Sequence, residues 1–78
     1  LLIFPNPANT TIQIQLQNTS ETIDFISITD VLGKTIRTVK GVSSNQLQVD
    51  VADLSQGVYF VEISTQNNLK QVKKLIKE

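Results

Sequence analysis

The residues that could do chemistry in this 78-residue chain are carboxylates and serine hydroxyls, because the chain contains no histidine and no cysteine. Without histidine, Ser43, Ser44 and Ser55 have no base that would activate them as nucleophiles. Without cysteine, neither a thiolate ligand nor a disulfide can form. No two carboxylates are spaced to act on one reacting bond, and we therefore predict no catalytic residues and no enzymatic activity. The acids are scattered over turns and outward strand positions: Glu21, Asp24, Asp30, Asp50, Asp53, Glu62 and Glu78.

Metal and cofactor sites are similarly poor in candidates. Asp50 and Asp53 could contribute oxygens to a calcium site, but no run of acids approaches the density of a dedicated calcium loop. Gly33 and Gly57 stand alone, far from any phosphate-cradling pattern, and are better explained by turns. We therefore predict no metal, no cofactor and no small-molecule substrate, and interpret the acids as solvated surface residues.

Charge and length restrict the class of protein further. Seven basic and seven acidic residues cancel, whereas nucleic-acid and anionic-membrane binders rely on a strong positive field. No apolar run approaches the roughly 20 residues needed to span a bilayer. The chain has the length of one small domain with a small core. The sequence thus predicts a single domain over residues 1–78, with no nucleic-acid partner and no membrane span.

The element that must position any functional group is the apolar run Val58–Ile63. Large apolar side chains on both of its faces predict a central, covered strand. Gly57 before it suits a positive φ at a sharp turn, and we expect Tyr59 to send its hydroxyl to a loop carbonyl at a sandwich edge. Residues Ala52–Gln56 are expected to form a single helical turn from which Leu54 enters the core.

Alternating apolar and polar residues, bounded by turn signals, predict the remaining strands: Thr11–Gln17, Ile23–Thr29, Lys34–Val39, Gln46–Val51 and Leu69–Glu78. The last of these also fits helical spacing, but the hairpin-like turn before it favours a strand. In Ile23–Thr29 we expect Ile26 and Ile28 to face inward, with a bulge or two-sided burial near Phe25.

Turn-forming residues separate these strands. We expect tight turns at Asp30–Gly33, with Gly33 at positive φ, and at Asn67–Asn68, a polar turn at Asn18–Thr22, and a loop at Gly41–Asn45. An irregular extended entry, Leu1–Phe4, is stopped by Pro5-Asn6-Pro7, because each proline fixes its own φ and restricts the residue before it. Six or seven short strands predict an all-β sandwich.

Lysine is concentrated in the last predicted strand. Two interpretations remain open. The lysines could guard a terminal edge strand against pairing with other molecules. Alternatively, cations and apolar side chains together could form a docking strip, even one that adds to a partner's sheet. The residues concerned are Lys70, Lys73, Lys74 and Lys77, interleaved with Val72, Leu75 and Ile76.

Four motifs then occur in a fixed order: Phe4-Pro5-Asn6-Pro7-Ala8, Ile28-Thr29-Asp30-Val31-Leu32-Gly33-Lys34, Leu54-Ser55-Gln56-Gly57-Val58-Tyr59 and Lys73-Lys74-Leu75-Ile76-Lys77. Together they closely resemble the type A C-terminal sorting domain of the type IX secretion system, found on exported proteins of the Bacteroidota. The resemblance covers essentially the whole chain. Phe4 stands where the family often has tyrosine, a conservative departure. The resemblance implies an immunoglobulin-like antiparallel β-sandwich of about seven short strands.

It also implies a function as an address. In the family, such a domain ends a larger secreted precursor, passes through the periplasm, and directs its cargo to an outer-membrane type IX translocon and so to the cell surface or medium. A sortase-like peptidase commonly removes it. By resemblance, partner recognition falls to Lys73, Lys74, Leu75, Ile76 and Lys77. The scaffold positions are Pro5, Asn6, Pro7, Asp30, Gly33, Leu54, Gly57 and Tyr59.

Two other functions stay open on the sequence. A non-catalytic surface module for carbohydrate or adhesion would need an exposed cluster of aromatic rings or a metal loop. A passive immunoglobulin-like spacer would need neither.

Overall fold

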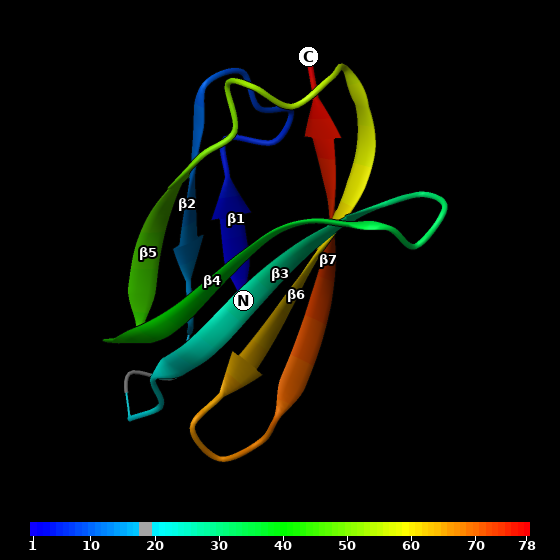
Figure 1. Cartoon of the computed structure of the whole chain (residues 1–78). Helices are drawn as coiled ribbons and strands as arrows, with labels where there is room; N and C mark the ends of the chain where they lie inside the picture. The colour runs from blue at the N-terminus through cyan, green and yellow to red at the C-terminus, as the bar shows by residue number, and fades with distance from the viewer. Residues whose placement is uncertain (18–19) are drawn as a thin grey trace.

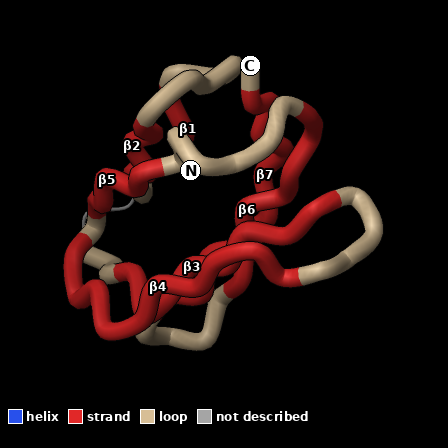
Figure 2. The backbone as a smooth tube through the Cα atoms, turned by 45° about the horizontal axis from the view of Figure 1, so that its top comes forward, coloured by secondary structure: helices blue, strands red, loops and turns tan. Residues whose placement is uncertain are grey.

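The structure, a computed structural model, describes residues 1–17 and 20–78, and in these residues it contains seven strands and no helix. The strands form two antiparallel sheets with the orders β1-β2-β5 and β4-β3-β6-β7, which face each other as separate layers (Figures 1 and 2). The predicted immunoglobulin-like β-sandwich is confirmed. The strands are β1 (Leu2–Phe4), β2 (Thr11–Gln15), β3 (Ile23–Asp30), β4 (Thr35–Ser44), β5 (Gln46–Asp50), β6 (Gly57–Thr65) and β7 (Lys70–Lys77).

The core lies between the sheets and follows the period-2 patterns. The inward residues of β2, Ile12 and Ile14, are fully buried, and so are Ile26 and Ile28 of β3, as predicted. Each such aliphatic side chain contributes about 1.5–3 kcal/mol by leaving water. A register shift between Ile23 and Phe25 provides the bulge that the adjacent large residues of β3 require.

Strand β6 is central in its sheet, between β3 and β7, but it is covered on one face only. Tyr59, Val61 and Ile63 face the core and are buried. Phe60 points the other way and is 38 % exposed. The prediction that both faces of this strand are covered was therefore wrong, because no second layer of described residues packs on the outer face of the four-stranded sheet (Figure 2).

The positive φ angles at the turns occur at the positions that the sequence predicts. Gly33 has φ 86°, Gly57 has φ 152°, and Asn68, in the hairpin between β6 and β7, has φ 63°. The Asp30 carboxylate accepts hydrogen bonds from the backbone N–H groups of Leu32 and Lys34, both at 2.9 Å. An aspartate at the first position of a turn typically makes this contact.

Three local predictions need correction. The entry segment is not irregular: Leu2–Phe4 forms β1 because β2 offers it an unpaired edge. The segment Gly41–Asn45, predicted to be a loop, is mostly strand, because the pairing of β4 with β3 continues to the pair Ile23–Ser44. Residues 52–56 form a hydrogen-bonded turn rather than a helical one, although Leu54 is buried as expected. The predicted turn Asn18–Thr22 includes two residues outside the described part of the chain.

Candidate recognition surface

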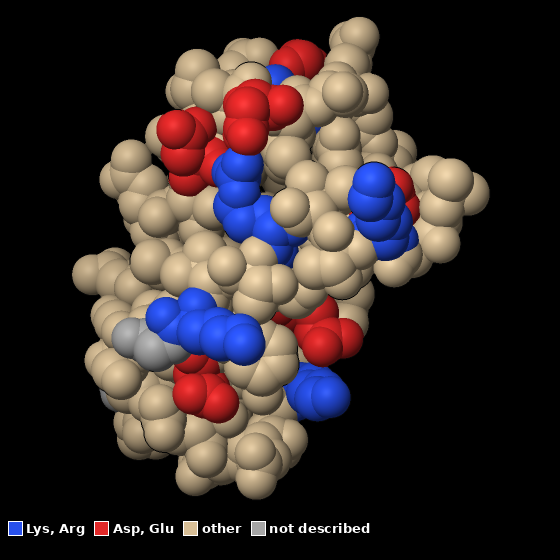
Figure 3. Space-filling model, in the orientation of Figure 1, with Lys and Arg blue, Asp and Glu red and all other residues tan. Residues whose placement is uncertain are grey.

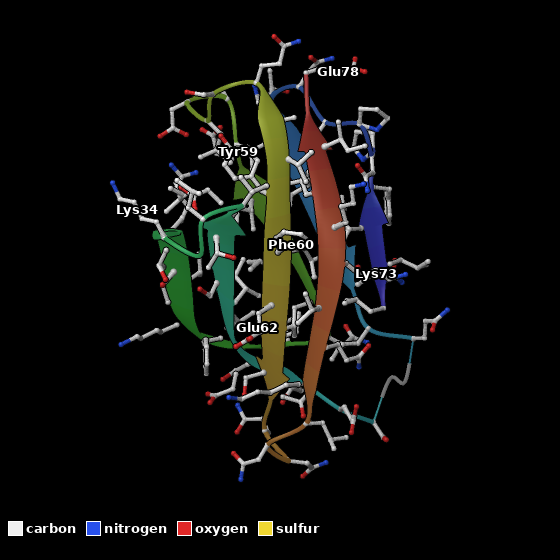
Figure 4. The ribbon with its side chains drawn as sticks, turned by 90° about the vertical axis from the view of Figure 1, so that its right-hand side faces the viewer. Lys34, Tyr59, Phe60, Glu62, Lys73 and Glu78 are labelled. Atoms are coloured by element: carbon white, nitrogen blue, oxygen red, sulfur yellow. The ribbon has the colours of Figure 1, made fainter. Side chains whose placement is uncertain are left out.

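The terminal strip, defined here as Lys73–Lys77, lies on β7 at the edge of the four-stranded sheet (Figure 4). Strand β7 pairs with β6 along eight consecutive residue pairs, from Gly57–Lys77 to Ser64–Lys70, without a register shift. The prediction of a strand in this segment is confirmed. Its regular pairing fixes which side chains of the strip face the core and which face solvent.

Burial divides the strip in two. Lys73, Lys74 and Ile76 are exposed, whereas Leu75 is fully buried and Lys77 is only 7 % exposed. The ammonium group of Lys77 donates a 3.1 Å hydrogen bond to the backbone carbonyl of Glu78. The family resemblance implies that Leu75 is one of the residues that contact a partner. In the folded domain it is instead a core residue that anchors the strip.

The Pro-Asn-Pro motif holds the outer edge of this strip. The Asn6 side-chain amide donates to the Lys74 carbonyl at 2.9 Å and accepts from the Ile76 N–H at 3.0 Å. A carboxamide carries both a donor and an acceptor, so it can take the place of a backbone amide in a neighbouring strand. The Asn6 side chain thus makes the two hydrogen bonds with the outer edge of β7 that a further strand would make there.

The backbone just after the motif extends the same contact. Ala8 N–H donates to the Ile76 carbonyl and Glu78 N–H donates to the Ala8 carbonyl, both at 2.8 Å, in a parallel bridge between Ala8 and Lys77. The chain therefore leaves the three-stranded sheet after β1 and crosses to the other sheet. The peptide bonds before Pro5 and Pro7 are both cis. Two prolines suit such a crossing, because they fix φ and need no hydrogen-bond partner for N–H.

A tyrosine corner lies on β6, which is separated from this crossing by β7. The Tyr59 hydroxyl donates a 2.6 Å hydrogen bond to the backbone carbonyl of Ser55, which confirms the predicted bond to a loop carbonyl. The Leu54 N–H donates to the Val51 carbonyl at 3.1 Å, and this bond closes the turn that precedes β6. Such a corner at the start of the corresponding strand is a hallmark of immunoglobulin-like sandwiches.

All four sequence motifs meet at one end of the sandwich. Tyr59 pairs with Asp30 of β3 on one side and with Leu75 of β7 on the other. Asn6 then binds the far edge of β7. The sequence showed the motifs in order but not this convergence, since their separation in sequence hides it.

The exposed face beside the strip mixes apolar and basic groups. Phe60 and Ile76 are each 38 % exposed, Val72 is 58 % exposed, and the exposed Lys74 is paired with Phe60 across β6 and β7. On the face drawn in Figure 3, basic and acidic side chains are interspersed rather than gathered into one field.

A second charged cluster, which the sequence did not reveal, joins the two sheets. Arg37 of β4 forms a 2.6 Å ion pair with Asp53 and also donates to the backbone carbonyl of Asp50. The bond to Asp53 raises the pKa of Arg37, and the same bond lowers the pKa of Asp53 below its ordinary value. An open pocket of about 340 Å³ lies here, lined by Arg37, Val39, Leu47, Gln48, Val49, Asp50 and Asp53.

Asp50 and Asp53 were the two acids considered for a calcium site. In the structure the charge of Asp53 is balanced by Arg37 instead of a metal ion. Within residues 1–17 and 20–78, no three acids, histidines or cysteines are grouped so as to hold a metal ion. Over the same residues, no helix has the length and apolar character to cross a membrane.

The fold and surface define a small immunoglobulin-like module whose distinctive feature is a lysine-rich edge strand fastened by a Pro-Asn-Pro motif. The chain belongs to the secretion system C-terminal sorting domain family, whose model matches residues 2–78, and it is a type IX secretion sorting signal. A search of the curated proteins found no match to the chain.

Proposed function

We propose that this chain is the sorting domain at the end of a larger exported precursor, and that the exposed part of the terminal strip is what the outer-membrane type IX translocon recognises. The domain acts as a substrate rather than a catalyst. A sortase-like peptidase of the system removes it once the cargo, which precedes this chain, reaches the cell surface. The single observation that supports the strip as the signal is its presentation: an edge strand, anchored by buried Leu75, with Lys73, Lys74 and Ile76 exposed.

The division of labour within the strip follows from burial. Lys73 and Lys74 are long cations in solvent, which steer encounter with a complementary surface and discriminate against unlike ones. Ile76 adds apolar contact area beside Phe60. Leu75 and Lys77 hold the strand in place, so their effect on recognition is indirect. Recognition therefore requires the folded sandwich.

Charge reversal at one exposed lysine tests the proposal without removing core residues. A reporter with an N-terminal signal peptide is fused before this chain and expressed in a bacterium with a type IX system. Lys74→Glu should lower the secreted or surface-bound reporter by about tenfold or more, the effect of losing about 1.4 kcal/mol of binding.

Lys40→Glu is the matched control. Lys40 is also exposed, lies on the opposite edge strand of the same sheet, and is paired with Phe25 as Lys74 is paired with Phe60. Its export should equal that of the unchanged fusion. Equal export of both variants and of a fusion lacking residues 73–78 would refute the strip as the signal.

A further inference from the structure

The outer edge of β7 is only half covered. Asn6 and Ala8 occupy the Lys74 carbonyl, both backbone groups of Ile76 and the Glu78 N–H. Because an antiparallel pair directs alternate residues toward and away from its neighbour, the N–H and C=O of Val72 and the N–H of Lys74 also point away from β6. No hydrogen bond from any described residue reaches these three groups.

The other sheet edges are less suited to pairing. β1 has three residues. At β5, the side chain of Arg37 already binds the carbonyl of Asp50. Strand β4 has two register shifts against β3 and a positive φ of 51° at Ser43, which twist an edge away from a partner. Among the described strands, β7 alone combines length, regular register and unpaired groups.

Charge determines which strand could add to this edge. Lys70, Lys73 and Lys74 are exposed, and none makes an ion pair within residues 1–17 and 20–78. A second copy of this edge would bring like charges directly opposite, which is destabilising. An acidic strand would bring opposite charges instead.

We propose that residues Lys70–Lys74 accept an extended acidic segment of the partner protein as an added β-strand. This rests on the proposed function and specifies how the partner engages the domain. The side chains of every second residue of β7, here Lys70, Val72 and Lys74, lie on the outer face of the sheet. The added strand would therefore carry acidic residues opposite the two lysines and an apolar residue opposite Val72. Main-chain bonds supply affinity, and this pattern supplies specificity.

The first test removes one outward N–H. Val72→Pro deletes the donor that the added strand needs, while the bonds of β7 to β6 remain, because proline is tolerated on an edge strand with its nitrogen facing solvent. Val72→Thr keeps the N–H and is the matched control. Export of the reporter should fall about tenfold or more with Val72→Pro and stay near normal with Val72→Thr. Amide exchange of Lys73 and Leu75 confirms that the variant keeps its pairing with β6.

The second test needs no variant. The peptide Thr-Glu-Thr-Val-Thr-Glu-Thr is titrated into the chain while backbone amide resonances are followed. Binding should shift the Val72 and Lys74 amides, slow their exchange and weaken with salt. A peptide with lysine in place of glutamate should not bind. Absence of any shift with the acidic peptide overturns the proposal, as does self-association through the same amides.

The two proposals fail differently. If Lys74→Glu abolishes export while a folded Val72→Pro variant exports normally, the strip is the signal but it is not read by strand addition. If neither variant changes export, the strip itself is not the signal.

Discussion

Asn6 accepts a hydrogen bond from the backbone N–H of Ile76, although 70 positions separate the two residues in sequence. The bond places the entry of the chain against its final strand. It also makes Asn6 a positioning residue for the proposed recognition surface, since the same side chain binds the Lys74 carbonyl.

Replacement of this amide should loosen the end of β7. Asn6→Ala removes two hydrogen bonds, each worth about 0.5–1.5 kcal/mol net, so we expect the free energy of unfolding to fall by about 1–3 kcal/mol. Denaturant titration measures this, and amide exchange should accelerate at Ile76. Asn9→Ala, at an exposed position in the same segment, is the control. Unchanged exchange at Ile76 in Asn6→Ala would contradict the positioning role.

The tyrosine corner should contribute to stability through its hydroxyl. Tyr59→Phe deletes the bond to Ser55 and leaves a carbonyl without its partner, and we expect a loss of about 1–2 kcal/mol in equilibrium unfolding. Phe60→Leu on the outer face of the same strand should cost less. Equal effects of the two substitutions would show that the corner bond is unimportant.

Substitutions at buried and exposed residues of the strip should have different effects on stability and on export. Leu75→Ala leaves a cavity in a fully buried position and should cost about 2–5 kcal/mol. Ile76→Ala, at a 38 % exposed position, should change unfolding little yet reduce export of the reporter. An Ile76→Ala variant that is exported normally would remove Ile76 from the proposed contact surface.

Gly33 should resist replacement for backbone reasons alone. Its φ of 86° disfavours a side chain, and a Cβ there would meet no atom within 4 Å. Gly33→Ala should therefore cost about 1–2 kcal/mol, and Gly33→Asn less, because asparagine tolerates this conformation better. Thermal melting of the two variants measures the difference. Backbone strain predicts that Gly33→Ala lowers the melting temperature more, whereas a steric clash predicts that Gly33→Asn, with the larger side chain, lowers it more.

The Arg37–Asp53 pair should make stability depend on acid pH. Because the folded domain lowers the pKa of Asp53, the pair stabilises the fold above the ordinary value of 3.8, and this contribution disappears as pH falls through the lower folded value. Asp53→Asn should flatten the stability profile in that range and leave its shape at pH 6–8 unchanged. The effect should be small, because Asp53 is exposed. The same dependence of stability on acid pH in the unchanged chain and in Asp53→Asn would contradict this role of the ion pair.

The sequence predicted what local patterns encode. Alternation identified the inward isoleucines of β2 and β3, and turn chemistry identified Gly33 and Asn68. The corner bond of Tyr59 followed because its partner, Ser55, lies only four residues away. These features depend on the period of a strand or on a few neighbouring dihedral angles.

What the sequence did not predict depends on distant partners. β1 exists because β2 leaves an edge open, and Ser44 is in a strand because Ile23 lies opposite it. The ion pair of Arg37 and Asp53 joins two sheets. Burial of Leu75, rather than its exposure, follows from the register of β7 against β6, which a one-residue slip would have reversed.

The parallel bridge between Ala8 and Lys77 has a mechanical consequence. Traction on the two ends of the polypeptide in opposite directions would slide these segments lengthwise past each other. The two bridge bonds and the two bonds of Asn6 would then bear the force simultaneously, in shear, instead of opening one after another like a zipper. A domain whose two terminal segments are joined in this way resists unfolding when its ends are pulled apart.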